Sequence, residues 1–452
     1  MRRATAIAVL VAPLLASCGP KQADNEISVQ RFFGTCVAQY GGRTDVAAAE
    51  GECGIMTTLI NKFSAEHPQY HIRINPVPWP GYNQLSAQLA TNDPPDVVTM
   101  HEAAISDYQS RGLLEPIGAE LKAVGVDPAS FTSASLQGVT KDGQVYGLPF
   151  DTWAPLWHIN MNYFRAAGLV RGDEPILPKS PEELLEHARQ FKKATGKPYF
   201  VQALTRERAA YARNLYTYLM QQNAPFFADP QRISLRTPEA RRVVELFKQL
   251  YDEDLTTKNQ DYAAATNGFM NGHGGVYLVG TWVIGDFRAQ SLLPDRPLTN
   301  GYTVVPYPQL FPGRDATYAD GHAWVVPTKQ RTREQRAAIF AFLAFMAEQN
   351  FEWSRTGHLP AFQSIIDSER FKALPFRTNI AELAVTGTPL PAGVQRQFPI
   401  QEIISDELTA AITGHKAVDA ALADAEHRIN DLLSHLLPNR VSHVENPHRR
   451  RP

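Results

Sequence analysis

The chain has 452 residues, of which 44% are hydrophobic and 20% charged, a balance typical of a globular protein and not of a disordered or membrane-embedded one. This length is too great for one compact core and predicts two or three domains. The 44 basic and 46 acidic residues leave a formal charge of −2, so no nucleic acid is expected as a partner.

The N-terminus carries the pattern of an export signal. Arg2 and Arg3 precede an apolar run over 4–14, which is too short to span a bilayer as a mature helix. A small-residue cleavage site then precedes Cys18, as in bacterial lipoproteins. We predict a lipoprotein signal peptide over 1–17, an acylated Cys18, a polar tether over 18–26 and a lipid-anchored location outside the cytoplasm. An ordinary secretory signal is the alternative.

Strand and helix patterns alternate over the first hundred residues. Strands are predicted over 27–33, 70–77 and 96–100, and helices over 55–66 and 82–91. The order strand, helix, strand, helix, strand predicts a parallel α/β sheet.

The remaining cysteines are expected to pair. Once Cys18 is acylated, only Cys36 and Cys53 are left, and an isolated pair in an oxidising compartment favours a disulfide. The spacing is not CxxC and no histidine is nearby, so neither a redox nor a metal role is expected.

Helical patterns dominate the rest of the chain. Ser180-Pro181 and Thr237-Pro238 each place a capping hydroxyl before a proline at the first helical position. The last helix is expected to split near Gly414. The predicted helices are 181–195, 208–221, 238–252, 333–350 and 405–436.

Enzyme and cofactor motifs are incomplete. His101-Glu102 begins an HExxH pattern, but Ile105 replaces the second histidine. The glycine-rich stretch 272–275 lacks the spacing of a nucleotide-binding loop, and no GxSxG elbow occurs. These absences argue against an enzyme, and neither a cofactor nor a metal is predicted.

Tryptophans lie in loop-like contexts. A flat apolar ring with polar neighbours suits a sugar, whose C–H face stacks on the ring while its hydroxyls form hydrogen bonds. Core packing is the alternative for each of them. The residues are Trp79, Trp153, Trp157, Trp282, Trp324 and Trp353.

Four segments together resemble family 1 extracellular solute-binding proteins, the substrate-capturing subunits of ABC importers for sugars, which include maltose-binding protein. The longest runs from Gly143 to Leu169 and resembles the hinge-crossing segment of that family. Phe269 to Trp282 is similar to its strand-and-loop element, 356–361 to its "tG.lPa" turn, and 94–97 to its "PDv" strand.

The resemblance implies a periplasmic-binding-protein fold with two α/β lobes joined by a hinge of several crossings. The N-terminal lobe would comprise 27–150 plus 306–354, the C-terminal lobe 151–305 plus 355–437, and 438–452 would form a flexible tail. Ligand would bind both lobes and so favour the closed state, which the permease recognises.

Candidate ligand-binding residues follow from the same arrangement, because open α/β sheets bind at the carboxyl ends of their strands. The stacking role of Trp282 is implied by the resemblance. Asp320 would serve either as a ligand contact or as a structural group. The candidates are Gly34, Tyr40, His101, Glu102, Asp151, Trp153, Trp282, His322, Trp324 and His358.

The function expected from these residues is a sugar receptor that works as a monomer with an ABC permease. A receptor for glycerol phosphate, peptides or metal chelates stays open as an alternative. A phosphate ligand should require cleft arginines, of which the motif loops contain few beyond Arg355. A lipid-anchored glycosidase or lyase is the enzyme alternative.

Overall fold

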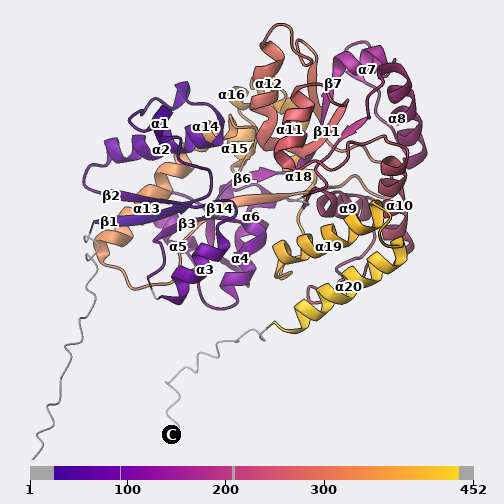
Figure 1. Ribbon diagram of the computed structural model, residues 1–452. Helices are drawn as coiled ribbons and strands as arrows, with labels where there is room; N and C mark the ends of the chain where they lie inside the picture. Colours follow the sequence, from indigo (N-terminus) through magenta and orange to yellow (C-terminus); the bar gives the residue numbers. More distant parts are fainter. Residues whose placement is uncertain (1–24, 92, 206–208, 437–452) are drawn as a thin grey trace, which may run out of the picture.

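The computed structural model describes residues 25–436 except 92 and 206–208. The chain forms two α/β lobes side by side, with α19 and α20 beneath the second lobe (Figure 1). The predicted signal peptide 1–17, Cys18, nearly all of the tether 18–26 and the tail 438–452 lie outside the described residues. Within the described ranges, no helix combines the length and the apolar character that a membrane crossing requires.

The first lobe is built on a six-stranded sheet. Its order is β15 (Leu359–Pro360), β6 (Gly147–Trp153), β14 (Asp320–Val325), β3 (Val97–His101), β1 (Glu26–Arg31), β2 (His71–Pro76). The three strands predicted in this region are confirmed, and β1 is parallel to both β2 and β3. The sheet as a whole is mixed and not parallel, because β14 inserts antiparallel between β3 and β6 and β15 pairs antiparallel with β6.

Helices cover both faces of this sheet. The helices α2 (Gly51–Glu66) and α13 (Arg333–Glu348) contact each other on one side, and α4 (Glu102–Gln109) and α6 (Ser133–Val139) contact each other on the opposite side (Figure 1). Phe63 on α2 packs edge-on against Phe342 and Phe345 of α13. Burying side chains of this size stabilises the lobe by about 1.5–3 kcal/mol each.

The second lobe has a four-stranded sheet in the order β10 (Phe200–Val201), β11 (Val276–Gly280), β7 (Pro155–Asn160), β12 (Tyr302–Val305). Along β11, Val276 and Leu278 belong to one hydrophobic cluster, whereas Tyr277 and Val279 belong to another. A strand buried on both faces must be apolar at every position, which explains the unbroken apolar run.

The predicted helices of the second half are present, and their caps are confirmed. The Ser180 hydroxyl accepts from Glu183 N at the start of α8 (Pro181–Thr195), and Thr237 accepts from Ala240 N at the start of α10 (Pro238–Asp252). The other helices here are α7 (Met161–Ala166), α9 (Ala209–Gln221), α11 (Tyr262–Met270) and α12 (Ile284–Leu292).

The last predicted helix is two helices, α19 (Gln397–Ile412) and α20 (Val418–Ser434). The break falls as expected at Gly414, whose φ of 78° is left-handed. The predicted start at 405 is wrong: α19 begins eight residues earlier, after Arg396. Likewise 333–350 is α13 followed by a separate short helix, α14 (Asn350–Ser354).

Short elements complete the fold. The helices are α1 (Val37–Tyr40), α3 (Tyr82–Ala90), α5 (Gly118–Ala123), α15 (Gln363–Ile366), α16 (Glu369–Lys372), α17 (Arg377–Ile380) and α18 (Leu383–Thr386). The 3-10 turns are η1 (Val46–Ala48), η2 (Pro128–Ser130) and η3 (Thr281–Val283). Two-stranded ribbons join β4 (Thr140–Lys141) with β5 (Gln144–Val145), β8 (Val170–Arg171) with β9 (Glu174–Pro175), and β13 (Thr317–Tyr318) with β16 (Gly387–Thr388).

Three crossings connect the lobes, each later in the chain than predicted. The chain leaves the first lobe at Ala154, between β6 and β7, and not at 150–151. It returns at 319–320 and not at 305–306, because Tyr307 to Tyr318 pack in the core of the second lobe. It leaves again after Phe362 and not at 354–355, because β15 and the residues after it stay with the first lobe.

Candidate ligand-binding site

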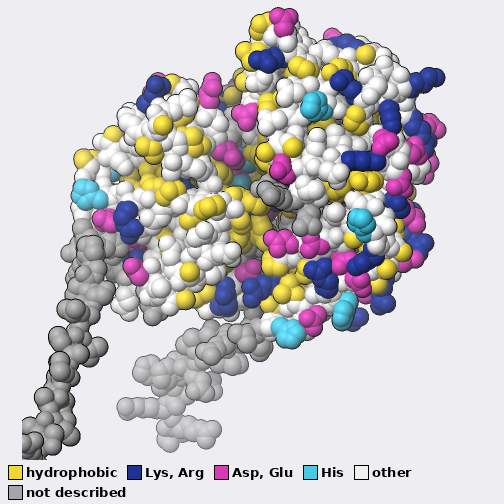
Figure 2. Space-filling model, in the orientation of Figure 1, with side chains coloured by type: hydrophobic (Ala, Val, Ile, Leu, Met, Phe, Trp, Pro, Cys, Tyr) yellow, Lys and Arg dark blue, Asp and Glu magenta, His cyan; other side chains and the backbone are white. Residues whose placement is uncertain are grey.

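The two lobes touch each other across the seam visible in Figure 2. Main-chain Arg396 N, at the start of α19, donates to Asp107 Oδ1 of α4 at 2.7 Å. The Phe398 ring of α19 lies 4.9 Å from the His101 ring and 5.9 Å from the Trp79 ring of the first lobe. The two lobes are therefore in direct contact along this seam.

Two tryptophans form an aromatic wall at the seam. The Trp153 and Trp282 rings meet edge to face at 5.5 Å, and the Arg213 guanidinium lies 4.5 Å from the Trp153 ring centre. Trp282 Nε1 donates to the Tyr262 hydroxyl at 2.7 Å. At Gly280 a Cβ would come within 1.9 Å of the Trp282 ring, so the family's glycine two residues before the tryptophan is what lets this ring lie against the strand end.

Asp151 is the centre of a buried hydrogen-bond network. His322 Nδ1 lies 2.9 Å from both carboxylate oxygens, His322 N donates at 3.0 Å, and Trp353 Nε1 donates at 2.7 Å. Burial alone would raise the pKa of Asp151, but the charges of His322 and His358 and these hydrogen bonds lower it overall. Asp151 is therefore an ionised carboxylate that ties together β6, β14 and α14.

His358 joins the same network. Its Nε2 lies 2.8 Å from Glu52 Oε1, and its Nδ1 lies 3.1 Å from Thr281 Oγ1. Burial opposes the charged form, yet Asp151 and Glu52 raise the pKa of His358 overall.

Among the described residues, Asp151, His322 and His358 are the group whose donor atoms lie close enough to hold a metal ion, within 4.8 Å of one another. Both Asp151 oxygens, His322 Nδ1 and both His358 nitrogens already have hydrogen-bond partners in the protein. These atoms are therefore already hydrogen-bonded within the protein, and their contacts do not by themselves indicate a bound metal ion.

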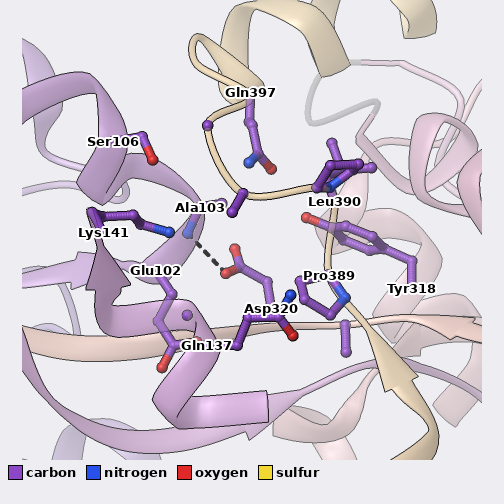
Figure 3. A pocket seen from close by; sticks show the side chains of 15 residues that line it. Glu102, Ala103, Ser106, Gln137, Lys141, Tyr318, Asp320, Pro389, Leu390 and Gln397 are labelled. Carbon is purple, nitrogen blue, oxygen red and sulfur yellow. Dashed lines mark hydrogen bonds between the residues drawn. The ribbon is translucent and has the colours of Figure 1, made fainter. Parts of the chain in front are cut away.

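A small cavity of about 30 Å³ lies at the seam (Figure 3). Its polar lining comes from both lobes and from the β14 crossing: Glu102, Ser106, Gln137, Lys141, Tyr318, Asp320 and Gln397.

Glu102 is held in this pocket with an unsatisfied carboxyl. Its side chain is buried, and Oε1 has no hydrogen-bond partner. A Cβ at Gly138 would come within 1.8 Å of Glu102 Oε2, and one at Gly321 within 2.7 Å of Oε1. The two glycines thus make room for the carboxyl.

The titration of the pocket acids is strongly perturbed. Burial raises the pKa of Asp320 to about 6, although its Oδ1 accepts from Ala103 N at 3.0 Å and Gly321 N at 2.8 Å. Burial, together with Asp320 and Asp151, raises the pKa of Glu102. Burial also lowers the pKa of Lys141. Buried carboxyls whose ionised forms destabilise the fold occur more often at functional sites than in purely structural positions.

Replacing Asp320 by asparagine should therefore stabilise the protein. The folded state binds the Asp320 proton up to about pH 6, against 3.8 ordinarily, so the carboxyl destabilises the fold as pH rises from about 4 to 6 and above. We expect Asp320→Asn to gain up to about 3 kcal/mol in the free energy of unfolding at pH 8, and little at pH 4. Urea denaturation at both values measures this; equal stability of variant and wild type at pH 8 would contradict it.

The structure brings most of the predicted site residues together at the seam. Lys141, Arg213 and Phe398 were missed, because they reach the seam through tertiary packing that no local pattern reveals. Trp79, 44% exposed, was considered for sugar stacking but not chosen as a site residue. The predicted residues that lie there are His101, Glu102, Asp151, Trp153, Trp282, His322 and His358.

Three predicted ligand residues have other positions. Trp324 is fully buried in the first-lobe core, with its ring 5.3 Å from Phe342, so its predicted ligand contact is wrong. Tyr40 packs its ring on Gly54 and accepts from Glu50 N at 3.3 Å, which makes it part of the disulfide loop and not of the pocket. Gly34, with a φ of 69°, packs against Cys53.

The predicted disulfide is confirmed: Cys36 and Cys53 are bonded, with a Cα–Cα distance of 5.8 Å. Closing this loop stabilises the fold by about 3 kcal/mol in the chain-entropy model.

Comparison with known proteins places the chain in a family. The model of the bacterial extracellular solute-binding protein family matches residues 58–379. This chain belongs to that family. The solute-binding protein is also 24% identical over 414 residues to the sn-glycerol-3-phosphate-binding periplasmic protein UgpB of Escherichia coli (strain K12), covering 85% of this chain and 90% of UgpB.

Solved structures confirm the predicted fold. Maltose-bound MalE3 of T. maritima superposes on the solute-binding protein with a TM-score of 0.74 at 17% identity, covering 90% of this chain and 99% of MalE3. The GacH receptor of Streptomyces glaucescens gives 0.75 at 17% identity, covering 91% and 99%. The protein is thus a two-lobed solute-binding subunit of an ABC importer, and its family and relatives are binding proteins that act outside the cytoplasm.

Proposed function

We propose that this solute-binding protein captures a mono- or oligosaccharide between its lobes and delivers it to an ABC permease without chemical conversion. The observation that carries this proposal is the pairing of two surfaces at the seam. The partly buried Trp282, packed edge to face on the buried Trp153, offers its ring to a sugar's apolar face, and the pocket acids Glu102 and Asp320 offer oxygens to its hydroxyls.

The charge of the pocket favours a neutral polyol over a phosphate ester. Glu102 and Asp320 line it beside one cation, Lys141, so a dianionic phosphate would lie among carboxyls. The Arg213 guanidinium at the seam is already engaged, stacked on Trp153 and donating to Gln401 at 3.2 Å. The likeness to UgpB keeps glycerol phosphate as the second candidate ligand.

Thermal denaturation in the presence of candidate ligands tests the proposal. A sugar at one hundred times its dissociation constant should stabilise the protein by about 2.7 kcal/mol. The panel comprises maltose, maltotriose, glucose, trehalose and sn-glycerol 3-phosphate, with product analysis of each mixture. Stabilisation by a sugar supports the proposal. Stabilisation by glycerol phosphate alone, or hydrolysis of a glycoside, would overturn it.

The lipid anchor belongs to the same proposal. An acylated Cys18 would hold a monomeric receptor at the membrane beside its permease. We expect Cys18→Ser to move the protein from the membrane fraction to the soluble extracytoplasmic fraction without changing ligand affinity. Fractionation and immunoblotting measure this, and retention of the variant in the membrane fraction would contradict an anchor at Cys18.

A further inference from the structure

The disulfide-closed loop of the first lobe, residues 36–53, is docked on the segment 352–358, which precedes β15. Arg355 of that segment donates three hydrogen bonds to main-chain carbonyls of the loop, at 2.8, 3.0 and 2.9 Å. The acceptors are Val46, Ala47 and Ala49. Because one guanidinium donates to three carbonyls of the loop, Arg355 holds the loop in a fixed position relative to the segment 352–358.

Glu52 lies at the end of this loop, next to the disulfide-bonded Cys53. Its carboxylate contacts His358 Nε2 at 2.8 Å, and the other nitrogen of the ring contacts Thr281 Oγ1 at 3.1 Å. Thr281 belongs to η3 of the second lobe, whereas His358 directly precedes β15 in the first-lobe sheet. The fully buried imidazole is therefore a bridge between the lobes.

The main chains are also in close contact at this bridge. Gly357 has a φ of 128°, and a Cβ there would come within 2.1 Å of the Thr281 carbonyl oxygen. Trp282, the next residue after Thr281, has its ring 6.5 Å from the His358 ring. The bridge is thus one residue away from the aromatic wall.

Charged groups from several elements surround His358. Glu52 and Asp151 favour its charged form, and Arg377 opposes it. His322 lies 5.6 Å away edge-on, and the Trp353 ring stacks on the imidazole at 5.6 Å. Asp286 of α12 also faces Glu52 and Glu50 across the seam. Both nitrogens of the His358 ring are in hydrogen-bond contact, one with Glu52 and the other with Thr281, and these contacts fix the orientation of the ring.

We propose that Glu52, held by the disulfide loop, is a positioning residue that orients His358 toward Thr281 and thereby stabilises the closed arrangement of the lobes. This inference rests on the proposed function, in which closure retains the ligand. When the hinge opens, His358 moves with the first-lobe sheet and Thr281 with the second lobe, so this hydrogen bond is lost.

Distances between spin labels on the two lobes test the proposal without any ligand. The labels are placed at Lys122→Cys on α5 and Leu292→Cys on α12, both exposed, in a chain that carries Cys18→Ser. We expect Glu52→Gln and Thr281→Val each to lower the ratio of closed to open molecules about threefold or more, as the loss of one hydrogen bond predicts. The double variant should fall no further, because both residues act through His358.

Matched variants separate positioning from general damage. Thr281→Ser keeps the hydroxyl and should restore the wild-type distance distribution. Glu50→Gln removes a neighbouring carboxylate that does not contact His358 and should leave the distribution unchanged. Wild-type distributions in both Glu52→Gln and Thr281→Val would overturn the positioning role. Failure of every sugar to bind the wild-type protein would overturn the proposed function instead.

Discussion

The variant Trp282→Ala is expected to bind its sugar roughly 30- to 1,000-fold more weakly than the wild-type protein. The ring supplies one face of the aromatic wall with Trp153, and truncating a central aromatic anchor typically costs about 2–4 kcal/mol of binding free energy. The fold should survive, because Trp282 is only partly buried. Isothermal titration with the sugar that stabilises the wild-type protein most measures the effect.

The matched control for this prediction is Trp157→Phe. Trp157 is fully buried in the core of the same lobe, whereas Trp282 is only partly buried. The Trp157→Phe variant should be less stable than the wild-type protein but should bind the sugar with unchanged affinity. Unchanged affinity in Trp282→Ala would rule out a stacking role for this ring.

The second large effect is expected for Asp151→Ala, which should lower the free energy of unfolding by roughly 3–5 kcal/mol at pH 7. The substitution leaves the Trp353 indole and the His322 ring and main-chain N–H groups without their acceptor in a fully buried site. Urea denaturation measures the loss.

The pH dependence of this variant follows from the lowered pKa of Asp151. A carboxyl whose pKa is depressed by folding stabilises above its ordinary value of 3.8, and that stabilisation is lost as pH falls through the folded pKa. The difference in the free energy of unfolding between Asp151→Ala and the wild-type protein should therefore become smaller at acidic pH. Asp173→Ala, whose side chain is 99% exposed, is the control and should change stability by less than about 0.5 kcal/mol. A comparably small change in Asp151→Ala would contradict the network.

The Asp151 carboxylate and the pocket acids have opposite effects on the stability of the fold. The folded state lowers the pKa of Asp151, so this ionised, hydrogen-bonded carboxylate stabilises the fold. Burial raises the pKa of Asp320 and Glu102, so the ionised forms of these carboxyls destabilise the fold. All three carboxyls lie near the paired ends of β6 and β14. The destabilising pair lines the pocket, where a ligand would satisfy it on closure.

Several features were decided by local sequence. The caps at Ser180 and Thr237 fix where α8 and α10 begin, because a hydroxyl and a following proline act within one turn. The break at Gly414 is equally local, since a left-handed φ favours glycine. The pairing of Cys36 with Cys53 followed from their being the two cysteines left.

The extent of α19 was not predictable in the same way. Its first turns, from Gln397, carry no capping hydroxyl, and Arg396 enters them with a φ of 58°. Contacts with α4 and α9 stabilise this helix start, and those contacts join residues hundreds of positions apart. Tertiary packing here outweighs the weak local signal.

Sequence by itself therefore determined the family, the two-lobed α/β architecture, the disulfide and the strand-and-loop element that carries Trp282, because each leaves a short motif or a local pattern. Only the tertiary structure decided which polar groups meet. Glu52 contacts His358 across 306 positions, Trp324 goes to the core while Trp282 reaches the seam, and Lys141 joins the pocket acids. Such contacts depend on how the crossings bring distant elements together, and burial then sets the pKa of each group.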